Sequence, residues 1–402
     1  METKRIQENI AEAARIIREG GLVAVPTETV YGLAGNGLSE EAVAKIYEVK
    51  GRPAVKPLSL MVPDESAMER YCLEIPPQAH ALARRFWPGP LTIVLKAKEN
   101  IPSIVLAGGK TVGLRCPDHP LTLELLRVCG LPLAAPSANP SGAESPKTAE
   151  KVLEYFDGKI GAVIDGGPCG IGRESTLIDM SAAPYRILRE GALPGEEIAR
   201  ALAENLTVIG LTGPSGVGKT TALRELEAMG ALVLDCDALY HEMLQSDQSL
   251  LKDLEDAFPG TVRDGILDRR ALGKIVFSDP EKLAILNRVS HEHIGREAER
   301  RLRDFAMRGG ELAAVDAVEL ISAGMDRYCT ATIGVLADRE IRLSRIMARD
   351  GISRAEAEAR ISAQKPDDYY QEHCTYILRN NTDRNSFAAD CRALYKEIIE
   401  NG

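Results

Sequence analysis

The sequence predicts an α/β protein with two domains, and three observations support this fold class. The chain has 402 residues, which exceeds the size of one typical domain. Short apolar runs typical of strands alternate with amphipathic helical segments along the sequence. One glycine-rich stretch, Gly213–Thr220, fits the pattern G-x-x-x-x-G-K-[ST] between an apolar run and a helical pattern. The connection over residues 193–205 reads as a short helix, so we expect one domain over residues 1–204 and another over residues 205–402.

The composition is that of an ordinary globular protein. Hydrophobic residues make up 45% of the chain and charged residues 27%, so disorder is not indicated. The formal net charge of −10 argues against direct, strong binding to nucleic acid. The eight cysteines form no C-x-x-C pair and no metal-binding spacing with histidine, so we expect reduced thiols in a cytoplasmic protein. No secretory signal or membrane-spanning run is visible, and residues 1–20 are expected to form an amphipathic helix.

The first half begins with elements whose ends carry polar residues. A buried strand is expected at Leu22–Val25, and short polar residues follow it. A helix over residues 40–49 then leads into a loop that contains glycine, proline and three cations, Lys50, Arg52 and Lys56. Such a constrained cluster favours an anionic ligand, although a solvated surface cluster is the commoner fate of lysine and arginine.

Further strands of the first half alternate with helices and turns. One turn, Ser137-Ala-Asn139, is rich in hydroxyl and amide groups and is suited to hold a polar small molecule. No glycine-rich phosphate loop occurs among these elements. The strands are expected at Leu58–Val62, Leu91–Leu95 and Thr111–Arg115, and within residues 162–165, 174–179 and 185–189.

Several motifs of the first half resemble, in order, those of the YrdC-like family of L-threonylcarbamoyl-AMP synthases. They are PTETVYGL (26–33), KGRP with KPL (50–58), APSAN (135–139), ESTLID (174–179) and RILREGAL (186–193). The resemblance covers about residues 5–200 and implies an α/β fold with a twisted mixed sheet. It also implies an enzyme that converts L-threonine, bicarbonate and ATP into L-threonylcarbamoyladenylate and pyrophosphate, for use by tRNA-modifying partner proteins.

The same resemblance implies which residues bind the substrates. Threonine contacts correspond to Thr29, Arg115, Ala135 and Ser175. ATP contacts correspond to Arg52, Lys56, Thr111, Ser137, Ser145 and Arg189, and Lys50 and Asn139 complete the paired motifs of the family. We assign Lys50 and Arg52 a catalytic role, in which their charges stabilise the phosphates in the transition state. One departure is Met61, which stands where longer family members often have a histidine.

The second half is organised around Gly213–Thr220. Backbone N–H groups of such a loop point inward and, together with the N-terminus of the following helix, hold phosphates. Lys219 is expected to reach the β- and γ-phosphates of ATP, and the Thr220 hydroxyl to ligate Mg²⁺. This half is therefore expected to be a P-loop NTPase with a parallel sheet, flanking helices and a helical lid. The expected ATP-binding residues of the loop are Gly213, Ser215, Gly216, Val217, Gly218, Lys219, Thr220 and Thr221.

Acidic residues at predicted strand ends indicate phosphoryl transfer. Asp235 and Asp237 follow an apolar run, and their i, i+2 spacing places both carboxylates on one side of a pleated strand. Either one acts as a general base or both hold Mg²⁺ through water, while Asp237 could instead cap a helix. Asp316 ends another apolar run, which is typical of a metal-associated acid. A charged helical pattern is expected at 267–303.

A series of arginines follows the apolar run 331–336 and predicts a lid that closes over phosphates. The alternative for most of them is a solvated helical face with salt bridges. We favour Arg345 and Arg349, because a helical spacing of four places them together. The series consists of Arg339, Arg342, Arg345, Arg349, Arg354 and Arg360.

The second half resembles the dephospho-coenzyme A kinases over about residues 206–400. The resemblance implies that Asp237 is the general base toward the 3′-hydroxyl of dephospho-coenzyme A, that Lys219 and the lid arginines stabilise the transferred group, and that Asn380 contacts ATP. Two departures, Glu292 after His291 and Ser322 in place of an acid, leave two alternatives open. These are a degenerate regulatory module and a kinase for another small nucleotide or nucleoside. The matching segments are LTG with GKTT (211–221), DCDALY (235–240), LDRRALGKIVFSDP (267–280), RIMARD (345–350), Gln364 and YILRN (376–380).

Overall fold

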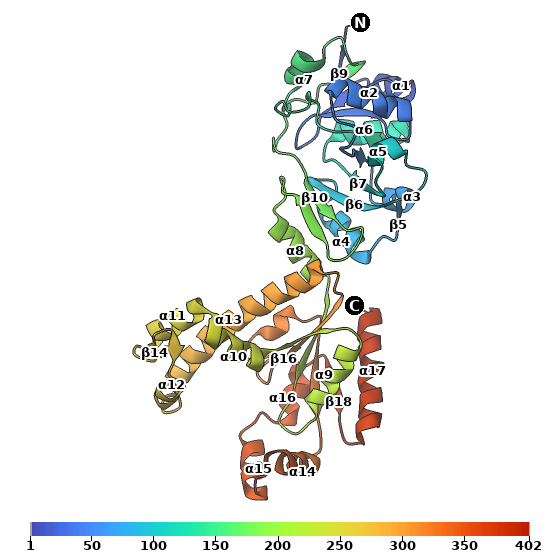
Figure 1. The fold of residues 1–402 in the computed structure, drawn as a ribbon. Helices are drawn as coiled ribbons and strands as arrows, with labels where there is room; N and C mark the ends of the chain where they lie inside the picture. Colours follow the sequence, from blue (N-terminus) through green and yellow to red (C-terminus); the bar gives the residue numbers. More distant parts are fainter. Residues whose placement is uncertain (1, 402) are drawn as a thin grey trace. The chain divides into compact units, whose positions relative to one another are not determined.

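A computed structural model describes residues 2–401, and in it the chain folds into two compact units. The first unit contains the chain up to Asn205 together with Met307–Gly309, and the second contains Leu206–Ala306 and the chain from Gly310 onward. Each unit has its own sheet and its own buried core (Figure 1).

The described part of the first unit contains one mixed sheet of eleven strands. The strands are β1 (Lys4–Ile6), β2 (Val23–Val25), β3 (Gly32–Asn36), β4 (Ser59–Met61), β5 (Cys72–Leu73), β6 (Leu91–Ala97), β7 (Thr111–Arg115), β8 (Leu133–Ala134), β9 (Ala162–Ile164), β10 (Thr176–Asp179) and β11 (Arg186–Arg189). Their order is β1-β9-β2-β3-β8-β4-β7-β6-β10-β11, with β5 beside β6. Parallel pairs such as β4 with β7 adjoin antiparallel pairs such as β6 with β7, so the expected mixed sheet is confirmed.

Amphipathic helices pack on this sheet. In the first of them, Ile10, Ala13, Ala14 and Ile17 are buried at the spacing of one helical face. They share a core cluster with Leu125 of the helix that begins at Pro120. The helices are α1 (Ile10–Arg18), α2 (Glu40–Lys50), α3 (Ala67–Tyr71), α4 (Pro77–Phe86), α5 (Ser103–Leu106), α6 (Pro120–Cys129), α7 (Ala149–Phe156) and α8 (Gly195–Glu204).

Several elements of the first unit were not predicted from the sequence, among them β1 and β3. The N-terminal segment is not one helix, because β1 pairs in parallel with β9 and α1 begins only after Asn9, whose side chain caps it. Strand β3 was not predicted, since its small residues carry no β-branched or aromatic signal. It pairs antiparallel with β2, so the polar residues 26–31 form the connection between two buried strands.

The second unit contains a five-stranded sheet in the order β13-β16-β12-β17-β18. Its strands are β12 (Thr207–Thr212), β13 (Leu232–Asp235), β16 (Leu312–Asp316), β17 (Ala331–Leu336) and β18 (Tyr376–Arg379), and a separate hairpin is formed by β14 (Val262–Arg263) and β15 (Ile266–Leu267). All neighbours in the five-stranded sheet are parallel, as predicted. Because β12 lies in the centre, the loop that follows it emerges at the carboxyl edge of the sheet between two strands, where ligands of such sheets bind.

Helices surround this parallel sheet, and α14 and α15 form a helical pair at one end of the unit (Figure 1). The helical stretch expected at 267–303 is interrupted, because β15 ends at Leu267, Asp268 caps α12, and α13 begins only at Pro280. The helices are α9 (Lys219–Ala228), α10 (Cys236–Ser246), α11 (Gln248–Ala257), α12 (Arg269–Val276), α13 (Pro280–Met307), the 3₁₀ turn η1 (Met325–Tyr328), α14 (Arg339–Asp350), α15 (Arg354–Ser362), α16 (Asp367–His373) and α17 (Arg384–Asn401).

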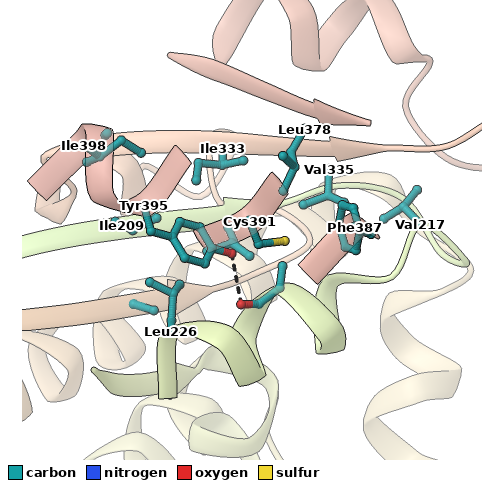
Figure 2. Close-up of a cluster of buried hydrophobic side chains, with 14 of the residues drawn as sticks. Ile209, Val217, Leu226, Ile333, Val335, Leu378, Phe387, Cys391, Tyr395 and Ile398 are labelled. Atoms are coloured by element: carbon teal, nitrogen blue, oxygen red, sulfur yellow. Dashed lines mark hydrogen bonds between the residues drawn. The ribbon is translucent and has the colours of Figure 1, made fainter. Parts of the chain in front are cut away.

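A buried cluster joins the sheet of the second unit to α9 and α17 (Figure 2). Phe387 and Tyr395 of α17 are fully buried in it, and the Tyr395 hydroxyl donates a hydrogen bond to the carbonyl oxygen of Ala222 at 3.0 Å. Because Ala222 belongs to the first turn of α9, α17 braces the helix that begins at Lys219. Other members are Ile209, Leu226, Ile333, Val335, Leu378, Cys391 and Ile398.

Among residues 2–401, no helix has both the length and the apolar character needed to cross a membrane. All eight cysteines are free thiols.

Candidate active sites

Three glycines shape the loop between β12 and α9. Gly213, Gly216 and Gly218 have φ angles of +144°, +83° and +97°, which strongly favour glycine. A Cβ atom on Gly213 would lie 2.3 Å from the carbonyl oxygen of Val335, and one on Gly218 would lie 2.2 Å from Nδ2 of Asn380. Backbone conformation and close packing therefore both require glycine in this loop.

Lys219, the first residue of α9, forms an ion pair with Asp316 at the end of β16. Its Nζ lies 2.8 Å from Oδ1 of Asp316, and both side chains are largely buried. Burial raises the pKa of Asp316, although the lysine opposes this shift. The carboxylate therefore holds the Lys219 ammonium group beside the loop.

The prediction that Asp235 and Asp237 place both carboxylates on one side of a pleated strand is wrong. The strand ends at Asp235 and the chain turns directly into α10. Oδ1 of Asp235 accepts hydrogen bonds from the backbone N–H groups of Asp237 (2.9 Å) and Ala238 (3.0 Å), so Asp235 is the N-cap of this helix.

The Asp237 carboxylate is exposed and has no hydrogen-bond or ion-pair partner among the described residues. Asp235 lies opposite Asp316 in the register of β13 and β16, which brings the start of α10 close to the Lys219–Asp316 pair. A carboxylate without a partner is thus available at the carboxyl edge of the sheet, where its charge interacts with that of Asp316.

Arg345 of α14 contacts the loop directly. Its Nη1 lies 3.4 Å from the carbonyl oxygen of Gly216, and its Nη2 donates to Oδ1 of Asn380 at 3.1 Å. Asn380 in turn donates from Nδ2 to the carbonyl oxygen of Val217 at 2.7 Å. Asn380 therefore supports the loop from behind.

A cavity of about 420 Å³ lies at the loop, and it brings Arg345 and Arg349 together. Arg349 also pairs with its neighbour Asp350, with 2.7 Å between Nε and Oδ1. Arg354 and Arg360 instead form ion pairs with acidic residues of α14. These two arginines therefore fit the alternative stated for the series, a solvated helical face with salt bridges. Thr221 and Asn380 do not line the cavity, whose lining residues are Gly213, Pro214, Ser215, Gly216, Val217, Gly218, Lys219, Thr220, Val318, Arg345 and Arg349.

Two residues that received no role from the sequence hold the loop in place. Gln364 accepts a hydrogen bond from the Ser215 N–H at 3.1 Å and donates from Nε2 to the Ser215 hydroxyl at 2.8 Å. Arg342 donates to Oε1 of Gln364 at 3.0 Å and to the carbonyl oxygen of Ser215 at 3.2 Å. Arg342 was one of six arginines in a series, and nothing in the spacing distinguished it from its neighbours.

The groups at this loop suit Mg²⁺ that arrives with a nucleotide. The Thr220 hydroxyl lies at the start of α9 and lines the cavity, whereas Asp237 is not among the lining residues. Mg²⁺ usually binds one or two protein oxygens and completes its coordination with phosphates and water. Residues 2–401 contain no cluster of three metal-ligating side chains that would hold the ion alone.

A second hollow in this unit, of about 510 Å³, lies between α13 and residues 319–327. It contains both positions at which the sequence departs from the kinase motifs, Glu292 after His291 and Ser322. Burial lowers the pKa of His291. The lining residues are Ala284, Asn287, Arg288, His291, Glu292, Glu319, Ser322, Ala323 and Arg327.

The first unit has a cavity of about 160 Å³ whose lining includes many of the residues predicted from motifs. The predicted residues that line it are Arg52, Arg115, Ala135, Ser137, Ser175 and Arg189, and the lining also includes Met61, Thr92 and Glu174. The predicted residues that do not line it are Thr29, Lys50, Lys56, Thr111, Asn139 and Ser145.

Arg115 is buried and held by three hydrogen bonds. Its Nη2 donates to the Thr29 hydroxyl at 2.8 Å and to Oε1 of Glu28 at 2.7 Å, and its Nε donates to the carbonyl oxygen of Gly89 at 3.3 Å. Thr29 therefore lies behind Arg115 and orients it. Glu28 received no role from the sequence, although it stands next to Thr29 within the PTETVYGL motif.

Lys50 is 3% exposed, and its ammonium group holds the turn that follows β8. It donates hydrogen bonds to the carbonyl oxygens of Ser137 and Asn139. Burial lowers the pKa of Lys50 to about 8. Its charge is thus directed at the backbone behind Ser137, whereas Ser137 itself lines the cavity.

Ser175 connects Arg189 to the sheet. Nη2 of Arg189 donates to the carbonyl oxygen of Ser175 at 2.8 Å and to its hydroxyl at 3.2 Å, and the hydroxyls of Ser175 and Thr92 are 2.8 Å apart. Arg52 is anchored by a 3.0 Å hydrogen bond to the carbonyl oxygen of Pro57. Burial lowers the pKa of both arginines, and positive charge is concentrated at the cavity.

Two family models match the chain. The Sua5/YciO/YrdC model, described as "Telomere recombination", matches residues 15–191. The CoaE model, described as "Dephospho-CoA kinase", matches residues 207–386.

Proteins named threonylcarbamoyl-AMP synthase are similar to the first unit. The protein from Pyrococcus abyssi is 50% identical over 202 residues, which are 50% of this chain and 59% of that protein. The protein from Halorhodospira halophila is 33% identical over 176 residues, which are 44% of this chain and 92% of that protein. The chain belongs to the threonylcarbamoyl-AMP synthase family. In this chain, a synthase domain is fused to a C-terminal dephospho-CoA kinase domain.

The similarity to the longer synthases is partial. The chain spans 59% of the Pyrococcus abyssi protein and 55% of the one from Bacillus subtilis. A crystal structure of Pyrococcus abyssi Sua5 complexed with L-threonine aligns with a TM-score of 0.49 at 32% identity, covering 84% of this chain and 100% of that one.

Proposed function

We propose that the protein is a bifunctional enzyme, with residues 1–204 as the synthase domain and residues 205–402 as the kinase domain. The first forms L-threonylcarbamoyladenylate and pyrophosphate from L-threonine, bicarbonate and ATP. The second transfers phosphate from ATP to the 3′-hydroxyl of dephospho-coenzyme A. The observation that carries this proposal is the presence of two cationic cavities, one on each sheet, within segments that match the two families.

In the synthase domain, the threonine nitrogen attacks the carbon of bicarbonate and water leaves, which gives a carbamate. An oxygen of this carbamate then attacks the α-phosphorus of ATP and displaces pyrophosphate. Arg115 receives the threonine carboxylate, and Arg52 and Arg189 offset the phosphate charge that shifts during the displacement. Lys50 acts through Ser137 by holding its turn, in place of the direct phosphate contact expected from the sequence.

In the kinase domain, Asp237 accepts the proton of the acceptor hydroxyl. The oxygen of this hydroxyl attacks the γ-phosphorus of ATP, and ADP leaves. Lys219, Arg345 and Arg349 stabilise the charge on the transferred group. The Thr220 hydroxyl would hold Mg²⁺ that arrives with the nucleotide, and the ion would supply positive charge that offsets part of the negative charge of the triphosphate. The hollow between α13 and residues 319–327 provides room for the acceptor.

Two variants of the full chain test this proposal. Lys219→Ala should reduce ADP formation with dephospho-coenzyme A by at least ~100-fold and leave pyrophosphate release with threonine and bicarbonate intact. Arg52→Ala should reduce pyrophosphate release and leave ADP formation with dephospho-coenzyme A intact. Loss of both activities in either variant would contradict the model of two independent sites.

A second candidate function for the kinase domain is phosphorylation of another small nucleotide or nucleoside. It is favoured by Ser322 and Glu292 in the second hollow, since both differ from the kinase motifs. Comparing ADP formation with dephospho-coenzyme A and with a panel of nucleosides distinguishes the two, and no ADP formation with any acceptor would indicate a regulatory module.

The product of the synthase domain is proposed to pass to tRNA-modifying partner proteins. Its mixed anhydride between carbamate and phosphate is an activated group, so a consuming enzyme must follow. A cytoplasmic location is proposed as well, and the eight free cysteines agree with a reducing compartment.

A further inference from the structure

Glu174 is the one carboxylate among the described residues that line the synthase cavity. The other charged residues of the lining are Arg52, Arg115 and Arg189. One oxygen of Glu174, Oε1, accepts a hydrogen bond from the Ser145 hydroxyl at 2.6 Å. No ion pair involves Glu174 within the part of the chain that the structure describes. A carboxylate is therefore fixed at the cavity with one oxygen still available.

Arg189 and Arg173 already interact with the charge of Glu174, and its available oxygen suits a cationic group of the ligand. The hydrogen bond from Ser145 lowers the pKa of Glu174, so the group is ionised at neutral pH. An ionised carboxylate repels the phosphates of ATP, whereas an α-amino acid carries an ammonium group as well as the carboxylate that Arg115 receives. The cavity thus contains a complementary group for each charge of an amino acid.

We propose that Glu174, held by Ser145, binds the α-ammonium group of the amino-acid substrate and thereby selects amino acids over hydroxy acids. This inference rests on the proposed function of the synthase domain. It also gives Ser145 a role as a positioning residue, because its hydroxyl is directed at Glu174 and it does not line the cavity.

The other cation that could meet Glu174 is Mg²⁺ carried by ATP. Mg²⁺ on ATP also needs only one or two protein oxygens. The ammonium group is favoured because Arg115, which receives the carboxylate of the same amino acid, lines the same cavity as Glu174. Binding without metal or nucleotide separates the two cations experimentally.

The test compares two ligands in the full chain by isothermal titration calorimetry, without Mg²⁺ and without ATP. L-Threonine carries the ammonium group, and 2,3-dihydroxybutyrate has a hydroxyl in its place. Glu174→Gln should weaken threonine binding by ~10-fold or more and leave the affinity for the hydroxy acid unchanged, because only the ammonium contact is charge-assisted. Ser145→Ala keeps the carboxylate and should weaken threonine binding by a smaller factor. Glu144→Gln, at an exposed position outside the cavity, is the matched control.

The outcomes are distinct. Threonine binding with undiminished preference over the hydroxy acid in Glu174→Gln overturns the inference and leaves the proposed function standing. A Glu174→Gln variant whose only defect is a changed Mg²⁺ dependence of ATP binding also overturns the inference, because Glu174 would then be a metal ligand. Wild-type protein that binds no threonine overturns the proposed function together with this inference. If Glu174→Gln folds poorly, the affinity of Ser145→Ala for threonine, relative to its affinity for the hydroxy acid, tests the same inference.

Discussion

Neighbouring residues of the same type have different roles in this protein. Asp235 caps α10 with two hydrogen bonds, whereas Asp237, two residues later, presents an exposed carboxylate near Lys219. Arg345 reaches the phosphate-binding loop, whereas Arg354 pairs with Glu340 on the lid itself. The backbone around each residue, more than its chemical type, decides whether its charge stabilises the fold or faces a substrate.

Substitution at the two aspartates should separate stability from catalysis. Asp235→Ala removes a helix cap and should lower the free energy of unfolding by about 1 kcal/mol. Asp237→Ala should leave stability within about 0.5 kcal/mol but reduce kcat of the kinase reaction by ~100-fold or more. Thermal unfolding and steady-state ADP formation measure the two effects. A large loss of stability in Asp237→Ala would show that its carboxylate also has a structural partner.

Breaking the buried Glu28–Arg115 pair should destabilise the first unit. Glu28→Gln leaves the Arg115 charge without its partner and should lower the free energy of unfolding by about 3 kcal/mol. Threonine should restore part of this loss, because its carboxylate replaces the missing negative charge. Urea unfolding followed by the fluorescence of Trp87, the single tryptophan of the chain, reports the first unit. Glu124→Gln, on the exposed face of α6, is the control, and equal stability of both variants would contradict the prediction.

The buried Lys50 should make stability depend on pH above neutrality. Its pKa is lowered to about 8 by burial, below the ordinary value of about 10.4 in the unfolded chain. Between these values the unfolded chain binds more protons, so the contribution of Lys50 to the free energy of unfolding rises with pH, by at most ~1.4 kcal/mol per unit. Wild-type protein should therefore gain stability relative to Lys50→Met between pH 8 and pH 10, measured by Trp87 fluorescence in urea. A difference that stays constant across this range would contradict the lowered pKa.

At the scale of elements, each site depends on a short backbone segment held by distant contacts. The loop between β12 and α9 needs glycine at three positions, while Gln364, Arg342 and Asn380 hold it from other elements. In the first unit, Lys50 of α2 holds the turn after β8 in a similar way. These contacts hold the backbone of both segments in place.

A comparison of two glycines separates steric packing from backbone strain. Gly218 and Gly230 both have positive φ angles, but a Cβ atom would collide with Asn380 only at Gly218 and would meet nothing within 4 Å at Gly230. The positive φ angle alone should make alanine cost about 1 kcal/mol of stability at either position, and the collision with Asn380 should add to this cost at Gly218. Only Gly218→Ala should abolish ATP binding by the kinase domain, as measured by calorimetry with the Arg52→Ala background to remove the other site. Normal ATP binding in that variant would mean that the loop tolerates a shift of Asn380.

At the scale of the whole molecule, the sequence predicted what is local and missed what is distant. The phosphate-binding loop and its flanking elements were predicted because glycines, lysine and threonine stand in one contiguous stretch. The Glu28–Arg115 and Gln364–Ser215 contacts were not predicted, because they join residues 87 and 149 positions apart. Strand β3 was missed for a different reason, since neighbouring strands and not its own small residues determine its conformation.

The two units should respond separately to their ligands. Each has its own core, so ligands that bind one unit should stabilise that unit alone. Threonine at 100 times its Kd should raise the stability reported by Trp87 by about 2.7 kcal/mol, whereas dephospho-coenzyme A should leave that signal unchanged and raise a second calorimetric transition. A single transition that both ligands shift equally would indicate one cooperative molecule.

The central position of β12 also affects how the second unit forms. Thr207 lies opposite Leu312, and Ile209 opposite Ala331, so both neighbours of this strand come from far along the chain. During synthesis, β12 therefore emerges with two unpaired edges, and these attract other extended segments until β16 and β17 follow. A nascent chain that has reached α13 is thus at its most vulnerable to aggregation and proteolysis.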